Sequence, residues 1–286
     1  MSRRTSLTPY LLIAPALGYM LFMVGYPLVE AIYLSFFEDG GLTLRHINYL
    51  LYDPLSKFDE AVRNTFLLIA IIVPAETILA IVVAVFLYKS FRGRDMLVYM
   101  VAIPLTISDV ASGLIWYSIF AGNGFLNKTL YSLGLIDSPI QFLGYEYKWR
   151  EVMVVAIAEI WRSMAIVFVI LFAGLQLLGK DLLEAAEVFG ASWWQRVRHI
   201  ILPMLKPSLQ SALIIRTLFA FQIFGVVMVL TGRDIPVLAG EAYWEYVELR
   251  NREVSALYAL IIAGLSLAFG FFYIRMLRAK FLEVGR

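Results

Sequence analysis

Apolar residues along the chain fall into six blocks, each long enough to cross a lipid bilayer as a helix. A span needs about 20 apolar residues, because a helix rises about 1.5 Å per residue and the hydrocarbon layer is about 30 Å thick. The blocks cover residues 9–36, 61–88, 96–121, 152–178, 207–230 and 254–277. The pattern predicts an all-α, polytopic membrane protein with six transmembrane helices, forming a single domain over residues 1–286.

Four prolines lie inside these blocks: Pro15, Pro27, Pro74 and Pro104. Proline is tolerated in membrane helices because neighbouring helices and local adjustments satisfy the freed backbone groups. We expect these positions to be kinks.

The distribution of Lys and Arg predicts the orientation. The short segments before the first block and after the second, fourth and sixth are denser in Lys and Arg than the alternate segments, with Arg3, Arg4, Arg92 and Arg94 as examples. Short cytoplasmic loops carry this excess. We therefore expect a multi-pass protein of the plasma or inner membrane, with both termini and the segment 179–206 in the cytoplasm.

Composition narrows the chemistry. Hydrophobic residues make up 61% of the chain and charged residues 16%, which fits lipid as the solvent of the whole chain. With no cysteine and two histidines, thiolate zinc sites, disulfide frameworks and histidine-rich metal sites are excluded. The net charge of +2 gives no reason to expect a nucleic-acid partner. We expect no metal site and no cofactor bound by this chain.

The segment 179–206 predicts two short helices at the cytoplasmic surface. Asp181 is a candidate N-cap and Gly190 a candidate C-terminal stop of the first. Ser192 and Gln195 form an S-x-x-Q capping box that would start the second helix, and Pro203 would interrupt it.

This segment resembles the EAA loop of binding-protein-dependent ABC permeases, whose pattern is EAA-x3-G-x9-I-x-L-P. The matching positions are Glu184, Ala185, Ala186, Gly190, Ile200, Leu202 and Pro203. The resemblance implies a coupling helix, which docks in a cleft of a cytoplasmic ATPase and transmits its closure to the membrane helices. A phosphate-binding GxxxxGK[ST] loop is absent from the sequence. We therefore expect a transport subunit and not an enzyme, with ATP and Mg²⁺ on separate ATPase subunits.

The whole chain resembles the first-type permease of maltose, trehalose and glycerol-phosphate-like importers. Matching segments include Ile13–Ala16, Tyr26-Pro27, Arg216–Phe224 and Leu230–Gly232. The resemblance implies a second six-helix permease (or a homodimer), two ATPase subunits and an extracytoplasmic binding protein. It also implies a di- or oligosaccharide cargo, such as trehalose or maltose.

Two departures from the family pattern concern the partners. Phe189 replaces a residue that is commonly acidic, and Arg233–Pro236 replaces a glycine-rich sequence. Because of Phe189, the family pattern does not predict the details of the ATPase contact. Because of Arg233–Pro236, it does not predict how the binding protein docks.

Polar residues inside the blocks are candidates for the translocation path, because ionisable groups are costly in a membrane. Glu159 and Arg162, three apart on a helix, share a face, and we favour a structural ion pair between them over a contact with the substrate. Glu76 and Asp109 would either line the path or hold a kink. Aromatic rings can stack on sugars and an amide can bond to hydroxyl groups, so the substrate candidates are Gln222, Phe219, Phe221 and Phe224, although each phenylalanine could equally face lipid or another helix.

Other functions remain open at this point. The same loop occurs in permeases for non-sugar cargo, such as glycerol phosphate, polyamines, phosphate or metals. An ion-coupled secondary transporter would use similar spans, but it usually shows inverted repeats and has no use for a coupling loop. An intramembrane enzyme is disfavoured because the sequence offers no acid–base or nucleophile constellation.

Overall fold

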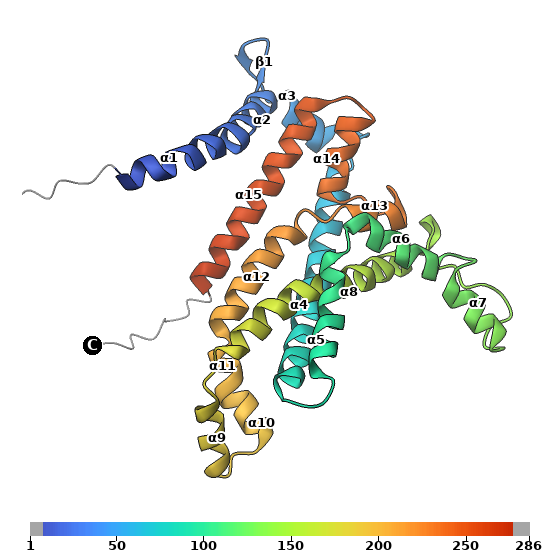
Figure 1. Ribbon diagram of the computed structural model, residues 1–286. Coiled ribbons are helices and arrows are strands. Elements are labelled where there is room, and N and C mark those ends of the chain that lie inside the picture. Colours follow the sequence, from blue (N-terminus) through green and yellow to red (C-terminus); the bar gives the residue numbers. More distant parts are fainter. Residues whose placement is uncertain (1–7, 277–286) are drawn as a thin grey trace, which may run out of the picture. The chain divides into compact units, whose positions relative to one another are not determined.

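The computed structural model describes residues 8–276 (Figure 1). Arg3 and Arg4, and the end of the sixth predicted span at residue 277, lie outside the described residues. Contacts divide the chain into two compact units, Met1–Phe58 with Glu241–Ile261 and Asp59–Gly240 with Ile262–Arg286. Each unit is described by itself.

The first unit holds a long apolar helix and a small hairpin. Helix α1 (Thr8–Met20) continues through the π-helical turn η1 (Leu21–Gly25) into α2 (Tyr26–Phe36). Strands β1 (Phe37–Glu38) and β2 (Gly41–Leu42) pair antiparallel, with Phe37 opposite Leu42, and α3 (Arg45–Tyr52) follows. The Asp39-Gly40 turn has positive φ at both residues, which matches the twist of a tight hairpin.

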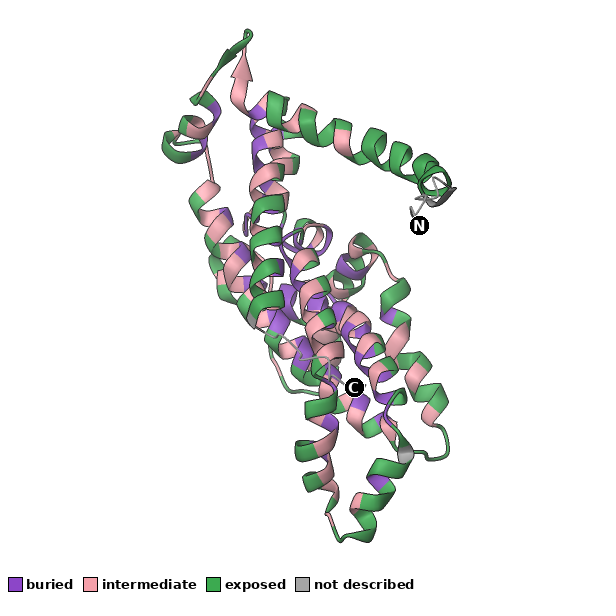
Figure 2. Ribbon diagram, turned by 90° about the vertical axis from the view of Figure 1, so that its left-hand side faces the viewer, coloured by how far each residue is buried: buried purple, intermediate pink, exposed green. Residues whose placement is uncertain are grey.

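The side chains of this long helix are largely uncovered. The apolar window within residues 10–36 has none of its residues buried, and Figure 2 shows α1 in the exposed colour along its length. Such a surface needs lipid or another polypeptide around it.

The second unit contains the other helices, which alternate between long spans and short pieces. Helices α14 and α15 run through both units. The elements are α4 (Phe58–Tyr88), α5 (Arg94–Ala102), η2 (Ile103–Thr106), α6 (Asp109–Phe120), α7 (Phe125–Ser132), η3 (Tyr145–Tyr147), α8 (Lys148–Gln176), α9 (Lys180–Val188), α10 (Trp193–Arg196), η4 (Val197–Ile201), α11 (Leu202–Met204), α12 (Lys206–Ala220), α13 (Gly225–Thr231), α14 (Leu238–Val247) and α15 (Arg252–Met276).

Four of the predicted spans are continuous helices and two are bent. In the described part of the chain four helices are long and apolar enough to cross a membrane, or up to six if each bent pair is one span. The third predicted span bends by 105° between η2 and α6, and the fifth bends by 47° between α12 and α13. The third span breaks beside Pro104, as a proline allows. The fifth breaks at residues 221–224, where there is no proline, and α4 continues as one helix through Pro74.

Two apolar clusters hold the second unit together. One joins α4 and α8 to the segment after α9, through buried residues such as Leu87, Leu171 and Ile201. The other joins α4, α8 and α13, through residues such as Leu68, Val155 and Val226. Close approach of α13 to α6 depends on Gly225, because a Cβ there would lie 2.6 Å from the Cβ of Asp109.

Candidate functional site

A buried arginine on α12 joins two carboxylates from other helices. Arg216 Nε lies 2.6 Å from Glu76 Oε1 on α4, as an ion pair that is not aligned as a hydrogen bond. Its Nη2 donates to Glu159 Oε1 on α8 at 3.1 Å. The side chains of Arg216 and Glu76 are 2% and 0% exposed. A charge buried this deeply is tolerated only when it is paired.

A second arginine extends the chain of charges toward the surface of the unit. Arg162 Nη2 lies 2.9 Å from Glu159 Oε1, and Nη1 lies 3.0 Å from Asp109 Oδ1 on α6. The side chains of Arg162 and Asp109 are 22% and 44% exposed. Three carboxylates and two guanidinium groups thus alternate across four helices, and we call these five residues the ion-pair network. Each arginine in it contacts two carboxylates.

Local structure explains how α8 and α6 position their side chains in the ion-pair network. Glu159, Arg162 and Ser163 are spaced by three and four residues, which places them on one face of α8. The Ser163 hydroxyl lies against the Glu76 carboxylate and 2.6 Å from the Glu159 carbonyl oxygen. Asp109 is the first residue of α6, directly after Ser108, whose hydroxyl caps the helix by accepting from Ala111 N at 3.2 Å. A carboxylate is favoured at that end of a helix.

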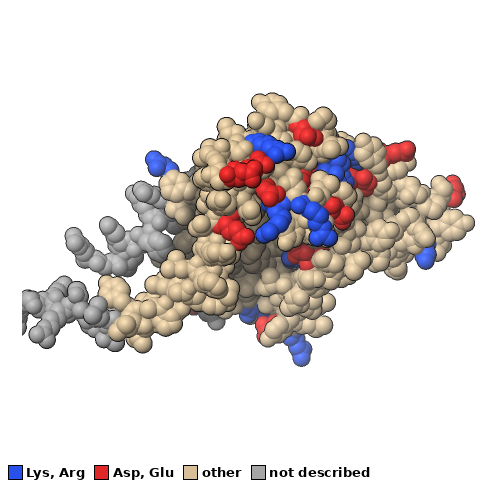
Figure 3. Space-filling model, turned by 90° about the horizontal axis from the view of Figure 1, so that it is seen from above, with Lys and Arg blue, Asp and Glu red and all other residues tan. Residues whose placement is uncertain are grey.

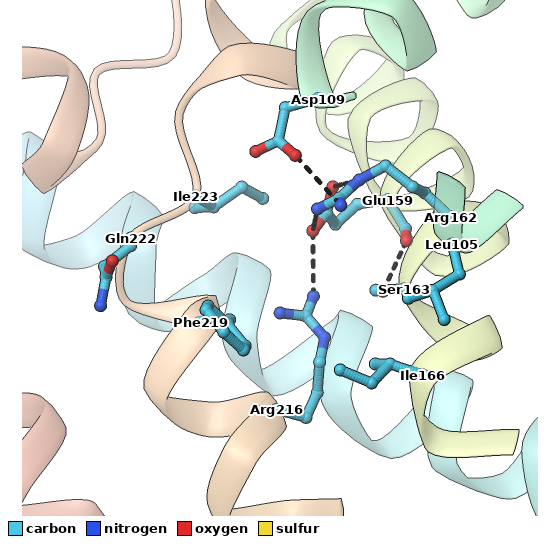
Figure 4. A pocket seen from close by; sticks show the side chains of 10 residues that line it. All are labelled: Leu105, Asp109, Glu159, Arg162, Ser163, Ile166, Arg216, Phe219, Gln222 and Ile223. Carbon is cyan, nitrogen blue, oxygen red and sulfur yellow. Dashed lines mark hydrogen bonds and ion pairs between the residues drawn. The ribbon is translucent and has the colours of Figure 1, made fainter. Parts of the chain in front are cut away.

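Four members of the network, all except Glu76, line a cavity of about 390 Å³. Figure 4 shows its lining, to which α12 and the break after it add Phe219, Gln222 and Ile223. The volume lies at the lower end of the range for small-molecule sites. Carboxylate oxygens, an amide and an aromatic ring around one cavity can accept from and donate to hydroxyl groups and cover an apolar ring face.

The fold places some of the other residues predicted for the translocation path at the cavity and the rest elsewhere. Phe219 and Gln222 line the cavity, although the Gln222 amide donates to the Leu218 carbonyl oxygen at 3.4 Å and points away from the ion pairs in Figure 4. Phe221 is buried instead, with its ring 5.6 Å from that of Phe66 and 5.1 Å from that of Phe269. Phe224 precedes α13 and is not among the residues that line the cavity, and neither is Glu76, which contacts Arg216.

Sequence reasoning missed five of the residues that line the cavity: Leu105, Ser163, Ile166, Arg216 and Ile223. The position of Ser163, four residues after Glu159, was the available signal for it. Leu105 carries no signal of its own, because its place follows from the bend after α5.

The segment between the fourth and fifth spans forms two short helices. Helix α9 contains Glu184, Ala185 and Ala186, and the chain reverses at Gly190, which has φ +82°. The predicted capping box is present: Ser192 Oγ accepts from Gln195 N, and the Gln195 side chain accepts from Ser192 N at 2.7 Å. The predicted N-cap at Asp181 is wrong, because α9 begins one residue earlier, at Lys180 after Gly179, and Asp181 lies in the first turn.

One side of this segment is packed and the other is bare. Leu183, Val197 and Ile201 are buried in the apolar cluster formed with α4 and α8, and Ile200 and Leu202 pack against it. In contrast, Val188 is 85% and Phe189 90% exposed, and Glu184, Ala185, Gly190 and Pro203 are exposed too. The helix pair is thus fixed to the membrane helices by one face, while the side with Ala185, Val188 and Phe189 stays open.

Two further observations concern metal-ligating and charged side chains in the part of the chain that the structure describes. No group of three or more His, Asp or Glu side chains there is arranged to hold a metal ion. On the face seen in Figure 3, acidic and basic side chains are interspersed, so that face offers no broad patch of positive charge for a nucleic acid.

Comparison with known proteins agrees with this arrangement. Residues 76–281 match the family model described as the binding-protein-dependent transport system inner membrane component. The trehalose transport system permease protein SugA of Mycobacterium tuberculosis is 33% identical over 233 residues, which are 78% of this chain and 72% of that protein. The trehalose/maltose transport system permease protein MalF of Thermococcus litoralis is 30% identical over 286 residues, covering 95% of this chain and 94% of that protein.

Solved structures show the same fold. A bacterial ABC transporter involved in the import of the acidic polysaccharide alginate has a chain that superimposes with a TM-score of 0.83 at 20% identity, covering 96% of each chain. A second structure, of a bacterial alginate ABC transporter in complex with an alginate pentasaccharide-bound periplasmic protein, gives 0.80 at 20% identity, covering 95% of this chain and 94% of that chain. This chain belongs to the family of inner membrane components of binding-protein-dependent transport systems, and it is a multi-pass membrane protein of the ABC permease type.

Proposed function

We propose that this chain is a permease subunit of an ATP-driven importer and forms half of the translocation path for a sugar. The cargo in this proposal is a di- or oligosaccharide, such as trehalose or maltose, that an extracytoplasmic binding protein delivers. Family membership and the sugar permeases among the relatives support it.

The observation that carries the proposal is the two-sided segment around α9 and α10. A helix pair that only connected two spans would have no need of an open face that includes Val188 and Phe189. Large exposed apolar side chains beside a rigid support favour a protein partner. The partner in this proposal is a cytoplasmic ATPase subunit, two of which would serve this chain and a second six-helix permease.

The same proposal sets the orientation. The segment must face the compartment that holds ATP, which puts both termini in the cytoplasm of a cell whose inner membrane holds the protein. The Lys and Arg distribution gives the same orientation by a separate argument.

The cavity beside the ion-pair network is the proposed contact with the sugar. Asp109 offers carboxylate oxygens to hydroxyl groups, Gln222 offers an amide, and Phe219 offers a ring face. Because both arginines of the network already contact two carboxylates each, the lining holds no spare guanidinium for a phosphate. This disfavours glycerol phosphate as the cargo.

A polyamine is the second candidate cargo. The carboxylate of Asp109 lines the cavity and is partly exposed, so it could accept hydrogen bonds from an ammonium group. The relatives with sugar names keep the sugar as the first candidate.

Purification of the tagged chain from its native membrane in mild detergent tests the proposal. Mass spectrometry of the companions should find an ATPase, a second permease and a binding protein, and a sugar should raise the ATPase rate. Stimulation by spermidine and not by any sugar would select the second candidate. A chain that purifies alone and drives uptake from an ion gradient would be a secondary transporter and would contradict both.

A further inference from the structure

Trp193 links the coupling segment to the end of α4. It is the first residue of α10, and the Nζ of Lys89 lies 4.0 Å from the centroid of its ring. Lys89 is the residue that follows α4. The guanidinium carbon of Arg196 lies 5.6 Å from the same ring, and Arg196 Nη1 lies 2.5 Å from Glu187 Oε2 on α9. Cations within about 6 Å of an aromatic centroid are attracted to it, so one indole joins both short helices to α4.

The link matters because the surrounding region is hollow. A cavity of about 670 Å³ lies between the turn after α4 and the two short helices. Lys89, Arg94, Glu184 and Trp193 are among the residues that line it. The segment also packs on α4 and α8 through the apolar cluster that contains Leu183 and Ile201, and the contact of Lys89 with Trp193 adds a link across the cavity to the turn after α4.

From the turn after α4, the chain leads directly to the cavity of the ion-pair network. Arg94 begins α5; its Nε donates to the Leu87 carbonyl oxygen at 2.8 Å, and its guanidinium lies 5.3 Å from the ring of Phe172 on α8. Helix α5 continues through η2 to Asp109, which pairs with Arg162. A displacement of this turn would therefore move the start of α5. The chain then runs from α5 through η2 to Asp109.

We propose that Trp193 is a positioning residue that transmits displacement of α9 and α10 to α5, and thereby to Asp109 at the cavity. The inference rests on the proposed function, because it takes the ATPase as the source of the displacement. It assigns a role to a residue outside the EAA pattern. Coupling through packed elements requires an element with two arrangements, and the proposal gives that role to α5 with η2, which meets α6 at a bend of 105°.

The test uses the complete importer with Trp193→Ala and Trp193→Phe. Trp193→Ala should retain the ATPase subunits at the wild-type ratio while sugar-stimulated ATP hydrolysis and uptake fall about tenfold. Trp193→Phe should recover most of the activity, because a phenyl ring still attracts Lys89. Phe91→Ala is the matched control: this ring lies in the same turn, with its centroid 5.6 Å from that of Phe86, and its removal should leave stimulation at the wild-type level.

A readout that needs no sugar separates this inference from the proposed function. The chain has no cysteine, so Met96→Cys on α5, at an exposed position, gives this subunit a single reactive thiol. Its maleimide labelling rate should change when ATP and vanadate are added, and should not change in the Trp193→Ala background. An identical nucleotide-dependent change in both backgrounds, or none in either, would overturn the inference.

If Trp193→Ala misfolds, Lys89→Met tests the same contact from its other side. Methionine keeps the length and the apolar stem of the side chain while removing its charge. Stimulated hydrolysis should fall about threefold by the same coupling argument. Wild-type behaviour of Lys89→Met would overturn the route through Lys89, and loss of the ATPase subunits from Trp193→Ala would place the indole in the docking surface and overturn the positioning role.

Discussion

The coupling segment and the ion-pair network solve different physical problems. The segment around α9 and α10 is held by contacts close in sequence, such as Ser192 with Gln195 and Glu187 with Arg196, and its outer face is open. The network is held by contacts between helices that are distant in sequence, and its inner members are buried. The structure of the coupling segment therefore depends on its backbone conformation, and that of the ion-pair network depends on the pairing of its charges. Substitutions should affect the two regions in different ways.

The largest expected effect is on the stability of the network. Arg216→Leu would leave Glu76 and Glu159 buried without their shared cation, and breaking one partner of a buried pair costs about 3–5 kcal/mol. Thermal unfolding in detergent should show this loss. Arg45→Leu is the control, because Arg45 pairs with Glu38 at an exposed site and should cost about 0–1 kcal/mol. Equal stability of the two variants would mean that the buried pairing is not structural.

The next effect concerns backbone shape in the coupling segment. Gly190→Pro is incompatible with φ +82° and removes the N–H that donates to the Glu187 carbonyl oxygen at 2.9 Å, a change worth about 3 kcal/mol locally. Sugar-stimulated ATP hydrolysis should be lost while the chain remains in the membrane. Gly190→Ala, which strains the turn by about 1–2 kcal/mol, should lose only part of the activity. Normal uptake by Gly190→Pro would remove this turn from the coupling mechanism.

A smaller effect is expected at the outer end of the network. Asp109→Asn removes one carboxylate from Arg162, but Glu159 still pairs with that arginine. Because Asp109 is partly exposed, the free energy of unfolding should fall by about 1 kcal/mol or less. The KM for the sugar should rise severalfold while basal ATP hydrolysis is unchanged. An unaltered KM would mean that Asp109 only holds the bend before α6.

The smallest stability effect should come from Gln222→Leu. The amide is exposed and its 3.4 Å hydrogen bond to Leu218 is weak, so the unfolding free energy should change by about 0.5 kcal/mol or less. Uptake kinetics provide the test, since loss of an amide at the cavity should raise KM without changing basal ATP hydrolysis. Gln210→Leu is a comparison on α12, the helix before the break that holds Gln222; Gln210 is not in the cavity lining, and its substitution is expected to leave KM unchanged.

More of the coupling segment than of the ion-pair network could be predicted from the sequence, and the reason is physical. The turn at Gly190 and the capping box at Ser192 depend on residues a few positions apart, so their pattern could be interpreted without the fold. The pairing of Glu159 with Arg162 was expected for the same reason, and the structure places them 2.9 Å apart. The pairing of Arg216 with Glu76 could not be predicted in this way, because nothing in the local sequence indicates which carboxylate on another helix will contact a given arginine.

The bend positions show a similar limit. Pro104 marks a break, but the break between α12 and α13 has no proline, and Pro74 lies within a continuous helix. Packing between helices decides these outcomes: Gly225 allows α13 to approach α6, and Phe221 inserts between Phe66 and Phe269. An aromatic residue in an apolar span gives no signal that separates such packing from a sugar contact.

The most direct test of the central claim is uptake by the complete importer in proteoliposomes. Labelled trehalose and maltose would be offered with the binding protein outside and ATP inside, in the presence of ionophores that collapse proton and sodium gradients. The account predicts ATP-dependent uptake that persists without gradients and is abolished by Gly190→Pro. Uptake that needs a gradient, or that survives Gly190→Pro, would contradict it.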